Sequence, residues 1–544
     1  MTRLTGCIAL LLGLIPFLAC GVPDDGVPGV EAAPTAAREA TLAAPYILQP
    51  SAGTATVEWT DSSAAGGSAL VLHSTGSSTT FTVSSSIPTG AYTVVLRTKA
   101  YYYLDWPRIS VQVKGQPRGE RTLTSTTFTS VSLGDQLLHP GDTVSITFLN
   151  DAYNGTSDTD RNVSVDELWL TPVVYSGPLV ITQGGTYTGN WESLDANVPA
   201  VQVRTSAPVI IDNANIRGRG HLITANFTRA NVTVRNTRGH GLHPNVAGRA
   251  RGRFLQAEEF NNLRVERCDF SSTSGMYFRA WRGTLASETI KIVGNRARNI
   301  DGRMANATGG HDPAANDYVQ FVQFNDVRNI PNVEIAWNEV INEPFVSRVE
   351  DNVSIYMSSG TSTNPIRIRD NFIKGGYPTD PLTQGYSGGG IMLSDGSSST
   401  VAGACGYVHA YGNVVISTTN YGIAISSGHD NLAYGNRIIS SGRLPDGRVP
   451  QAQNVGLYIW DIHGDAQYGT FFNNVARDNQ INWTKINPST GTVGENAWWL
   501  PDCAPGACTN NQDLTGAATL ADEQTEHTGW LTRVAQQGIT LGAP

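Results

Sequence analysis

The chain has 544 residues, a formal net charge of −9 and only 15% charged residues. This length exceeds what one hydrophobic core usually serves, so two or more structural units are expected. The scarcity of basic residues argues against a nucleic-acid binder, which needs a basic face. The 57 glycines, together with abundant Ser, Thr, Asn and Val, favour β-structure with many turns.

The N-terminal segment, MTRLTGCIALLLGLIPFLACG, combines an early Arg, an apolar stretch over residues 7–18 and small residues before Gly21. This pattern predicts a secretion signal over 1–20, too short to cross a membrane as a helix. The tetrapeptide FLAC resembles a bacterial lipoprotein cleavage box, which leaves lipidation of Cys20 and ordinary cleavage as alternatives. We therefore expect an exported protein, extracellular or held at the outer surface by a lipid anchor.

Six cysteines are few for an exported protein of this size, so disulfides are not expected to organise the fold. Cys503 and Cys508, in PDCAPGACT, are close enough in sequence to close a small C-terminal loop. Cys268 and Cys405 lie in repeat-like stretches and are predicted to be buried apolar side chains. No cysteine spacing suggests a zinc site.

The composition divides the chain into regions. Residues 21–44 are rich in Pro, Ala and Gly and lack a periodic apolar pattern, which predicts a flexible linker. From 45 to 174, alternating apolar runs such as YTVVLRTKAY and DTVSITFLND are separated by turn residues, which predicts an antiparallel β-sandwich of jelly-roll type. A second unit is expected at 178–500, and a C-terminal cap or tail at 501–544.

The second unit contains a degenerate repeat in which an Asn follows a short alternating strand. Its members are VIIDN, VTVRN, IKIVGN, VEIAWN, IRIRDN, VHAYGN, LAYGN and TFFNN, with the last Asn at 213, 236, 295, 338, 371, 413, 436 and 473. A short coil of three strands and three turns, stacked on itself, is a parallel β-helix. Asn suits a tight corner because it tolerates the left-handed backbone and can bond a stacked neighbour. We expect the Asn residues from 295 to 436 to stack at one corner.

Over 178–500 this pattern resembles the right-handed parallel β-helices of the pectate-lyase superfamily. In that architecture an Asn-rich corner precedes the third strand, and long loops lead into the strand that floors the substrate groove. The sequence has matching strands before the later Asn residues: YFRAW, YVQFVQF, VSIYMSS, GIMLSDG, GIAISSG and GLYIWDI. Insertions of variable length precede these strands, and loops that vary over a constant frame are where function tends to sit.

The segment LNDAYNGTSDTDRNVSVDELWL concentrates four aspartates between residues 149 and 170. Carboxylates this crowded repel one another unless a cation neutralises them, and hard oxygen ligands suit calcium; the alternative is a solvated turn with Asx caps. Together with DWPRISVQV upstream, the segment resembles the calcium-dependent xylan-binding carbohydrate modules, which contain a similar NDAY…DRN…VD block. The resemblance implies Asp151 and Asp160 as calcium ligands, Asp158 as a further candidate, and a calcium ion that holds sugar hydroxyls.

A sugar-binding unit joined to a grooved β-helix predicts a polysaccharide-active enzyme, although the resemblance does not choose the reaction. If Ile391, Ile423 and Leu457 point inward, the alternate residues of these strands point outward. Aromatic faces in such a row suit stacking on pyranose rings, or else pack under loops. The candidate substrate-binding residues are Arg279, Trp281, Tyr356, His429, Tyr458, Trp460 and His463.

Carboxylates recur at both edges of this row. Asp317 and the pair Glu350–Asp351 lie where loops enter their strands, whereas Asp395 and Asp461 lie where strands end. Because coils stack about 4.8 Å apart, Asp395 and Asp461 are expected about 10 Å from each other, near the spacing of an inverting glycosidase. Asp317 and Asp351 are expected about 5 Å apart, as a catalytic pair or a second calcium site.

Acid-rich edges with an aromatic floor favour a glycoside hydrolase acting on a neutral plant cell-wall glycan, with xylan first. A lyase or epimerase acting on a uronate-containing glycan would need a basic groove, and the row offers only Arg279, with Arg282 and Arg348 nearby. Neither the pectate-lyase arginine motif nor the polygalacturonase motif set is recognisable. A non-catalytic glycan-binding surface protein is the third alternative. We expect a monomer that binds calcium and polysaccharide.

Overall fold

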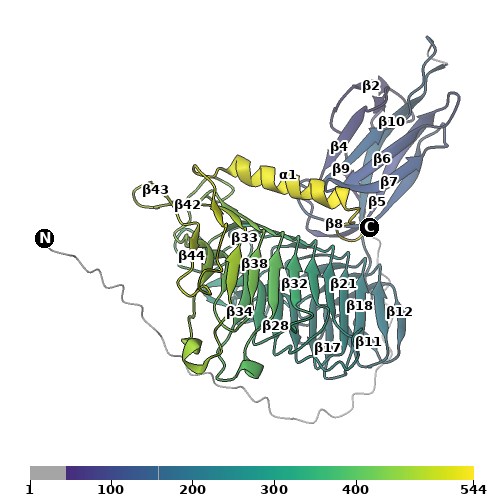
Figure 1. Ribbon diagram of the computed structural model, residues 1–544. Coiled ribbons are helices and arrows are strands. Elements are labelled where there is room, and N and C mark those ends of the chain that lie inside the picture. Colours follow the sequence, from purple (N-terminus) through teal and green to yellow (C-terminus); the bar gives the residue numbers. More distant parts are fainter. Residues whose placement is uncertain (1–43, 157–158) are drawn as a thin grey trace. The chain divides into compact units, whose positions relative to one another are not determined.

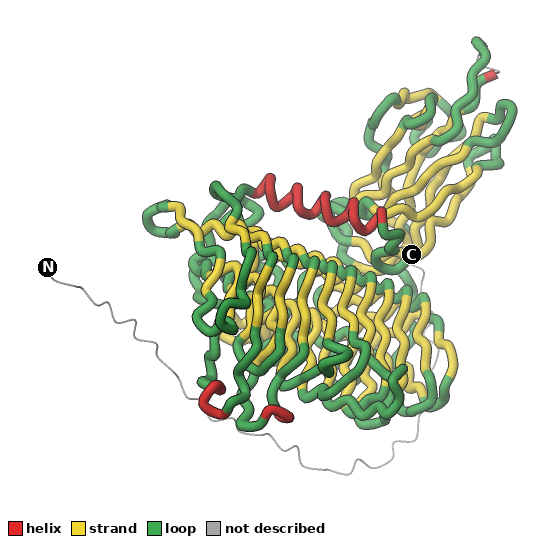
Figure 2. Tube along the Cα trace, viewed as in Figure 1, coloured by secondary structure: helices red, strands yellow, loops and turns green. Residues whose placement is uncertain are grey.

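The computed structural model describes residues 44–156 and 159–544, almost all of them in β-structure or turns (Figures 1 and 2). The predicted signal segment and nearly all of the predicted linker lie outside the described residues. None of the helices in the described part has the length and apolarity needed to pass through a bilayer. The predicted fold class is confirmed, because antiparallel sheets at the N-terminal end are followed by long parallel sheets.

Two antiparallel sheets form the N-terminal β-sandwich. Apolar and polar residues alternate along its strands: Val144, Ile146 and Phe148 are fully buried, whereas the residues between them are half-buried. The larger sheet contains β1 (Tyr46–Leu48), β2 (Thr56–Thr60), β3 (Ser68–Leu72), β10 (Asn162–Pro172), β5 (Gly90–Tyr101) and β8 (Thr129–Leu138). The smaller sheet contains β4 (Ser78–Thr82), β9 (Thr143–Phe148), β6 (Arg108–Val113) and β7 (Gln116–Thr122).

The following segment is a parallel β-helix in which each coil adds one strand to each of three sheets, so that strands stack in rungs (Figure 2). The first sheet contains β11 (Leu179–Ile181), β14 (Val201–Val203), β17 (Ile223–Asn226), β20 (Leu255–Glu258), β23 (Gly275–Arg279), β28 (Gln320–Asn325), β31 (Asp351–Tyr356), β34 (Gly389–Asp395), β37 (Tyr421–Ile425), β40 (Val455–Ile459) and β44 (Trp498–Trp499). All six strands predicted to floor a groove belong to this sheet.

The other two sheets complete the coils. The second contains β12 (Gly185–Tyr187), β15 (Val209–Asp212), β18 (Asn231–Arg235), β21 (Asn262–Glu266), β24 (Ile290–Val293), β29 (Glu334–Ala336), β32 (Ile366–Arg369), β35 (Val408–Tyr411), β38 (Leu432–Tyr434) and β41 (Val475–Arg477). The third contains β13 (Asn190–Ser193), β16 (Asn215–Gly218), β19 (Arg238–Gly241), β22 (Asp269–Ser271), β25 (Arg296–Arg298), β30 (Glu339–Ile341), β33 (Phe372–Gly376), β36 (Val414–Thr418), β39 (Arg437–Ser440), β42 (Gln480–Ile486) and the antiparallel β43 (Val493–Glu495), with β45 (Gln512–Asp513) beside β42. Ile391, Ile423 and Leu457 lie in the fully buried interior, so the predicted inward register is confirmed.

An asparagine ladder runs along the corner between the second and third sheets. The side-chain amide of Asn295 donates to Asn338 Oδ1 at 2.9 Å, and the same bond repeats from Asn338 to Asn371, Asn413 and Asn436 at 2.9–3.0 Å. Each of these amides also donates to a backbone carbonyl, and each carbonyl oxygen also accepts a backbone N–H. The predicted stack is therefore confirmed, and Asn479 and Asn511 extend it.

The backbone at this corner differs from the prediction in one respect. The left-handed residue is the one before each ladder Asn, for example Trp337 (φ 56°) and Asp370 (φ 54°). Asn213 and Asn236 take that left-handed position themselves, one residue before the ladder. Cys268 occupies a ladder position, where its N–H donates to Asn295 Oδ1 at 2.9 Å.

A second, shorter pairing of asparagines lies at another corner. Asn474 accepts from the side chain of Asn431 at 3.0 Å, and the preceding Asn473 is left-handed (φ 52°). Asn473 is therefore not a member of the main ladder, although the strand before it has the same sequence pattern.

The C-terminal segment packs along the third sheet of the β-helix, against Phe372, Val414, Ile416 and Ile439 of successive coils. Helix α1 (Leu520–Gln536) begins with a capping box formed by Thr519 and Asp522. Trp530 is buried, and its Nε1–H donates to Asp370 O at 2.8 Å, next to the ladder. Cys503 and Cys508 form the predicted disulfide, and Cys268 and Cys405 are buried free thiols as expected.

Asn371→Ala tests how much stability the ladder carries. The substitution strands the Asn338 amide and two backbone groups in the buried corner, and each stranded group costs about 1–3 kcal/mol. We expect the free energy of unfolding to fall by about 3 kcal/mol or more, measured by chemical or thermal denaturation. The matched control is Asn197→Ala, because Asn197 is exposed. Equal stability of both variants would show that the ladder is not a main source of stability.

Candidate functional site

Long insertions lead into successive strands of the first sheet at one edge. The hairpin of β26 (Arg303–Ala305) and β27 (His311–Asn316) precedes β28, and loop 377–388 precedes β34. Gln384 Nε2 in this loop donates to Pro313 O in the hairpin at 3.0 Å. The insertions therefore contact one another along the edge where variable loops were predicted from the sequence.

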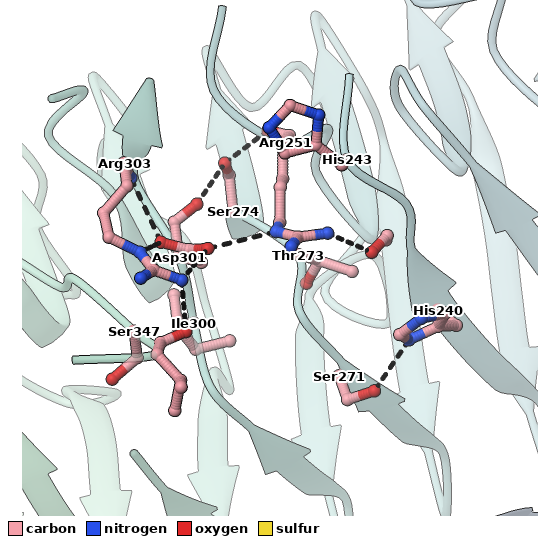
Figure 3. Close-up of polar contacts among 12 residues, drawn as sticks. His240, His243, Arg251, Ser271, Thr273, Ser274, Ile300, Asp301, Arg303 and Ser347 are labelled. Atoms are coloured by element: carbon pink, nitrogen blue, oxygen red, sulfur yellow. Dashed lines mark hydrogen bonds and ion pairs between the residues drawn. The ribbon is translucent and has the colours of Figure 1, made fainter. Parts of the chain in front are cut away.

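The base of this hairpin is anchored on the buried carboxylate of Asp301 (Figure 3). Asp301 is 1% exposed and accepts from Arg303 Nε at 2.8 Å and from Arg251 Nε at 3.0 Å. Arg303 also donates to Val346 O at 2.7 Å, in the next insertion. These contacts satisfy the buried charges and hold two insertions together, so this cluster supports the edge of the first sheet.

Asp351 begins β31 at this edge and is 8% exposed. Its Oδ1 accepts a hydrogen bond from the buried hydroxyl of Tyr421. Burial raises the pKa of Asp351 well above its usual range, and the carboxylates of Glu350 and Asp395 raise it further, against the opposing effects of Tyr421 and Arg348. A carboxyl group in this setting retains its proton at higher pH than usual and is suited to act as a general acid.

Glu350 lies beside Asp351 and is partly exposed. Its Oε2 accepts from Arg348 Nη2 at 2.5 Å and from Ser387 Oγ at 3.2 Å. Arg348 also donates to the backbone oxygen of Asp317 at 3.0 Å. The Asp317 carboxylate instead accepts the N–H of Tyr318 at 2.9 Å. The hydrogen bonds thus join Glu350 to Arg348, and the expected closeness of Asp317 to Asp351 stays a prediction.

Asp395 and His463 lie at the opposite edge of the first sheet. Asp395 ends β34 opposite Tyr356 of β31, and its charge raises the pKa of Asp351 at the start of that neighbouring strand. His463 Nε2 is 3.3 Å from Asp395 Oδ1, and the two side chains are 34% and 36% exposed. The hydrogen bond to Asp395 raises the pKa of His463 above its ordinary value. Acids therefore stand on both edges of the outer face.

Asp461 has a different setting from the one predicted. Its two oxygens accept the N–H groups of Asp465 and Ala466 at 2.8 Å each, at the start of the 3-10 helix η3 (Asp465–Tyr468). The expected spacing of Asp395 and Asp461 stays a prediction, and Asp395 contacts His463 of the same loop as Asp461. Coil spacing alone could not show this, because it says nothing about how the loop after β40 folds back.

The outer face between the two edges is partly apolar. Met392, Ala424 and Tyr458 point outward as predicted, yet they are buried in a small cluster with Tyr421 and Val455. Tyr458 is 8% exposed and packs edge-on against Tyr421, so it does not present an open face for stacking.

The open aromatic surface lies one coil further along. Trp460 packs at a tilt against Trp499, with ring centroids 5.0 Å apart, and Trp499 is 47% exposed. Sequence reasoning missed Trp499 because the two-residue strand β44 has no alternation to detect.

Two of the predicted substrate-binding residues build corners instead. His429 is buried, stacks on Phe472 with centroids 4.8 Å apart, and its Nδ1 is 2.8 Å from Asp430 Oδ2. Trp281 follows the left-handed Ala280 and donates its Nε1–H to Asn261 O at 2.8 Å. Arg279 and Tyr356 remain at the end of the outer face, where Arg279 pairs with Glu258 at 2.6 Å.

The β-sandwich brings Asp151 and Asp160 together. Burial raises the pKa of Asp151, and the Asp160 carboxylate raises it further. Asp151 Oδ1 and Asn162 Oδ1 are buried and make no hydrogen bond within the described residues, and Asp160 Oδ2 accepts from Asn162 Nδ2 at 2.7 Å. Asp158 lies outside the described residues, and the rest form no group of three His, Cys, Asp or Glu that could hold a metal.

These oxygens fit a hard cation. Two neighbouring carboxylates with an unpaired buried oxygen need a positive charge, and backbone and amide oxygens complete a calcium shell in proteins. Arg161 holds the surrounding loops by donating its Nε–H to Tyr103 O at 2.9 Å. Asp166, by contrast, is buried in an ion pair with Arg97 and so builds the strand.

Residues 93–178 match the family model of Ca-dependent, xylan-binding carbohydrate-binding modules, CBM60. This span contains Asp151 and Asp160, and the resemblance inferred from the NDAY and DRN blocks is therefore confirmed for this part of the chain. No curated protein matches the chain.

Solved structures similar to part of the chain include the CBM36-1 domain of a multidomain xylanase from the hindgut metagenome of Trinervitermes trinervoides, with 14% identity over 24% of this chain and 98% of that one and a TM-score of 0.19. The family 35 carbohydrate-binding module from Clostridium thermocellum has 18% identity over 23% and 98%, with a TM-score of 0.19. The catalytic domain of a GH87 α-1,3-glucanase in complex with nigerose has 12% identity over 86% and 99%, with a TM-score of 0.27.

Asp160→Asn should weaken calcium binding. The variant removes one of the two carboxylates whose repulsion a cation relieves, so the affinity for Ca²⁺ measured by isothermal titration should fall by at least tenfold. Glu120→Gln is the matched control, because Glu120 is an exposed acid of the same β-sandwich. Unchanged Ca²⁺ affinity in Asp160→Asn would remove Asp160 from the metal site.

Asp395→Asn should lower the pKa of His463. Asp395 stabilises the charged imidazole, so in the wild type His463 stays protonated to a higher pH than an ordinary histidine. Titration of the His463 ring followed by NMR should show a downward shift in the variant, with His73 as an internal reference. An unchanged titration of His463 would contradict the contact between these two side chains.

Proposed function

We propose that this chain is a secreted glycoside hydrolase that cleaves a neutral glycan on the outer face of the first sheet. The observation that carries the proposal is the arrangement of carboxyl groups on both edges of that face, with Glu350 and Asp351 on one edge and Asp395 on the other. Glycosidic bond cleavage needs an acid that protonates the leaving oxygen and a carboxylate on the opposite side of the sugar. A glycan lying across the strands would pass between these two groups.

The settings of the acids suggest a division of roles. Asp351 is the general acid, because burial and the nearby carboxylates keep its proton in place. Asp395 is the carboxylate opposite it, exposed to the groove and held by His463. Glu350, paired with Arg348, raises the pKa of Asp351 by its charge. Acid–base catalysis at neutral pH usually needs neighbouring carboxyl groups with different pKa values, and different environments produce that difference.

The β-sandwich supports the proposal as a targeting module. Asp151 and Asp160 would hold a calcium ion, which when bound supplies open positions for sugar hydroxyls. The match of residues 93–178 to xylan-binding modules makes xylan the first polysaccharide to test. A module that binds the polymer raises the local concentration of glycan at the groove, because linked sites act at a high effective concentration.

The arginines near the groove do not favour a lyase. Arg279 pairs with Glu258 at 2.6 Å, Arg282 with Glu259 at 3.2 Å and Arg348 with Glu350 at 2.5 Å. A base that abstracts a proton from a uronate must be free to accept it, and a groove for uronates needs net positive charge. Each of these three arginines is offset by a glutamate, which favours hydrolysis of a neutral glycan over elimination.

Variants of the three acids test the proposal. Asp351→Asn and Asp395→Asn should each lose about 10²–10⁴-fold in turnover, because each removes a proton-transferring group or its partner. Glu350→Gln should reduce turnover less and shift its pH dependence, because it removes one charge that raises the pKa of Asp351. In the wild type, activity should fall as the pH rises through the raised pKa of Asp351. Activity is measured as new reducing ends from a polysaccharide panel that begins with xylan.

Asp478→Asn is the control for these variants, because Asp478 forms an exposed ion pair with Arg477 between β41 of the second sheet and β42 of the third. All variants should keep the wild-type melting temperature and calcium-dependent retention on xylan. Near-wild-type turnover in Asp351→Asn and Asp395→Asn would place the chemistry elsewhere. Products that absorb ultraviolet light, as unsaturated sugars do, would identify a lyase instead.

A further inference from the structure

A row of polar side chains continues along the outer face on the N-terminal side of the acids. Tyr277 of β23 is aligned with Gln323 of β28, and Arg279 is aligned with Asn325 and then with Tyr356 of β31. We call these five residues the polar tract. Tyr356 is in turn aligned with Asp395, so the polar tract ends beside a proposed catalytic residue. All five are half-buried.

Much of the hydrogen-bonding capacity of the polar tract is not used by the protein. Asn325 Nδ2 donates to the Tyr277 hydroxyl at 2.9 Å. The Gln323 amide, Asn325 Oδ1 and the Tyr356 hydroxyl have no hydrogen-bond partner among the described residues. Half-buried polar groups that lack a protein partner must be satisfied by water or by a ligand. Three such groups on two adjacent strands form a surface on which a hydroxyl-bearing ligand can replace water.

The polar tract also has little net charge. Arg279 is its one ionised side chain, and the guanidinium is paired with Glu258 at 2.6 Å. The remaining side chains are amides and phenols, which donate and accept hydrogen bonds without selecting for an ionic partner. Sugar hydroxyls also donate and accept, so the chemistry of the surface matches a neutral glycan better than a polyanion.

The two sides of the acids differ. On the C-terminal side the outer face turns apolar, with Met392, Ala424 and Tyr458 buried, and ends at the exposed pair Trp460–Trp499. On the N-terminal side it offers amides and hydroxyls. Aromatic rings stack on the apolar face of a pyranose ring, whereas amides form hydrogen bonds that depend on where the hydroxyl groups lie. Discrimination between sugars that differ in hydroxyl orientation is therefore expected on the N-terminal side.

We propose that the polar tract is a row of sugar subsites on the N-terminal side of the cleaved bond, in which Gln323 and Asn325 select neutral sugar residues by their hydroxyl groups. This inference rests on the proposed hydrolysis at Asp351 and Asp395. A glycan would run across β23, β28 and β31, where successive strands offer contacts about 4.8 Å apart. The contacts lie away from the breaking bond, so they contribute mainly to substrate binding.

The kinetic test uses the full-length protein, the polysaccharide that it cleaves best, and the variants Gln323→Ala, Asn325→Ala and their double. Each single variant should raise KM about two- to tenfold, as expected for the loss of one or two neutral hydrogen bonds, with kcat changed less. The double variant should also shift the lengths of the early products, which a purely structural defect would not do. Melting temperatures should stay at the wild-type value.

Gln202→Ala is the matched control. Gln202 of β14 lies in the same outward row as Gln323. Strand pairing aligns Gln202 with Thr224, then with Gln256, Tyr277 and Gln323 on successive strands. Gln202 is therefore four strands, or about 19 Å, from Gln323. Its KM and products should equal those of the wild type. If the double variant has the wild-type KM and products while Asp395→Asn is inactive, the proposed sugar-binding role of the polar tract is wrong. The proposed hydrolysis is then still supported.

A binding test separates the two ideas. It uses Asp160→Asn to silence the calcium module, and titrates xylohexaose and other neutral hexasaccharides into this variant with and without the two alanine substitutions. Binding that the double substitution abolishes supports the polar tract even if the wild type cleaves nothing, in which case only the hydrolysis is overturned. Absence of hexasaccharide binding, or binding that the double substitution leaves unchanged, overturns the polar tract.

Discussion

The stacking of one coil directly on the next is the constraint on which the rest of the structure depends. The asparagine ladder enforces it, because each amide bonds to the carbonyl of the Asn in the next coil and to a buried backbone oxygen. A shift of one residue in any coil would break these bonds and turn the inward Ile and Leu residues to the surface. Residues far apart in sequence, such as Tyr356 and Asp395, therefore meet at a defined place on the first sheet.

Features that repeat could be predicted from the sequence. The strands, their inward register and the Asn stack follow from alternation and from a side chain that can bond its own copy in the next coil. The finer backbone geometry could not, because Asn is common both at the left-handed position, as in Asn213, and at the ladder position, as in Asn295. The left-handed position and the ladder position are adjacent in sequence, and only tertiary contacts show which of the two an Asn occupies.

The candidate site was harder to predict because its residues lie where the repeat is interrupted. Asp351 and Glu350 could be placed at one edge from their position before a strand, but the bond from Tyr421 to Asp351 depends on a side chain two strands away. Asp461 and His463 are two residues apart after the same strand, and only the turn at η3 decides that Asp461 caps the backbone while His463 reaches Asp395. Loops without a period carry no such information in their spacing.

The electrostatics of the outer face connect the acids to the choice of ligand. Burial is the main cause of the raised pKa of Asp351, and a cationic side chain near it lowers that pKa, as Arg348 does. Arg279, Arg282 and Arg348 are each bound to a glutamate, which offsets their charge beside the face. Glu350 raises and Arg348 lowers the pKa of Asp351, so this pair bears on the proposed general acid. The pairs of Arg279 and Arg282 bear instead on the proposed preference for neutral sugars.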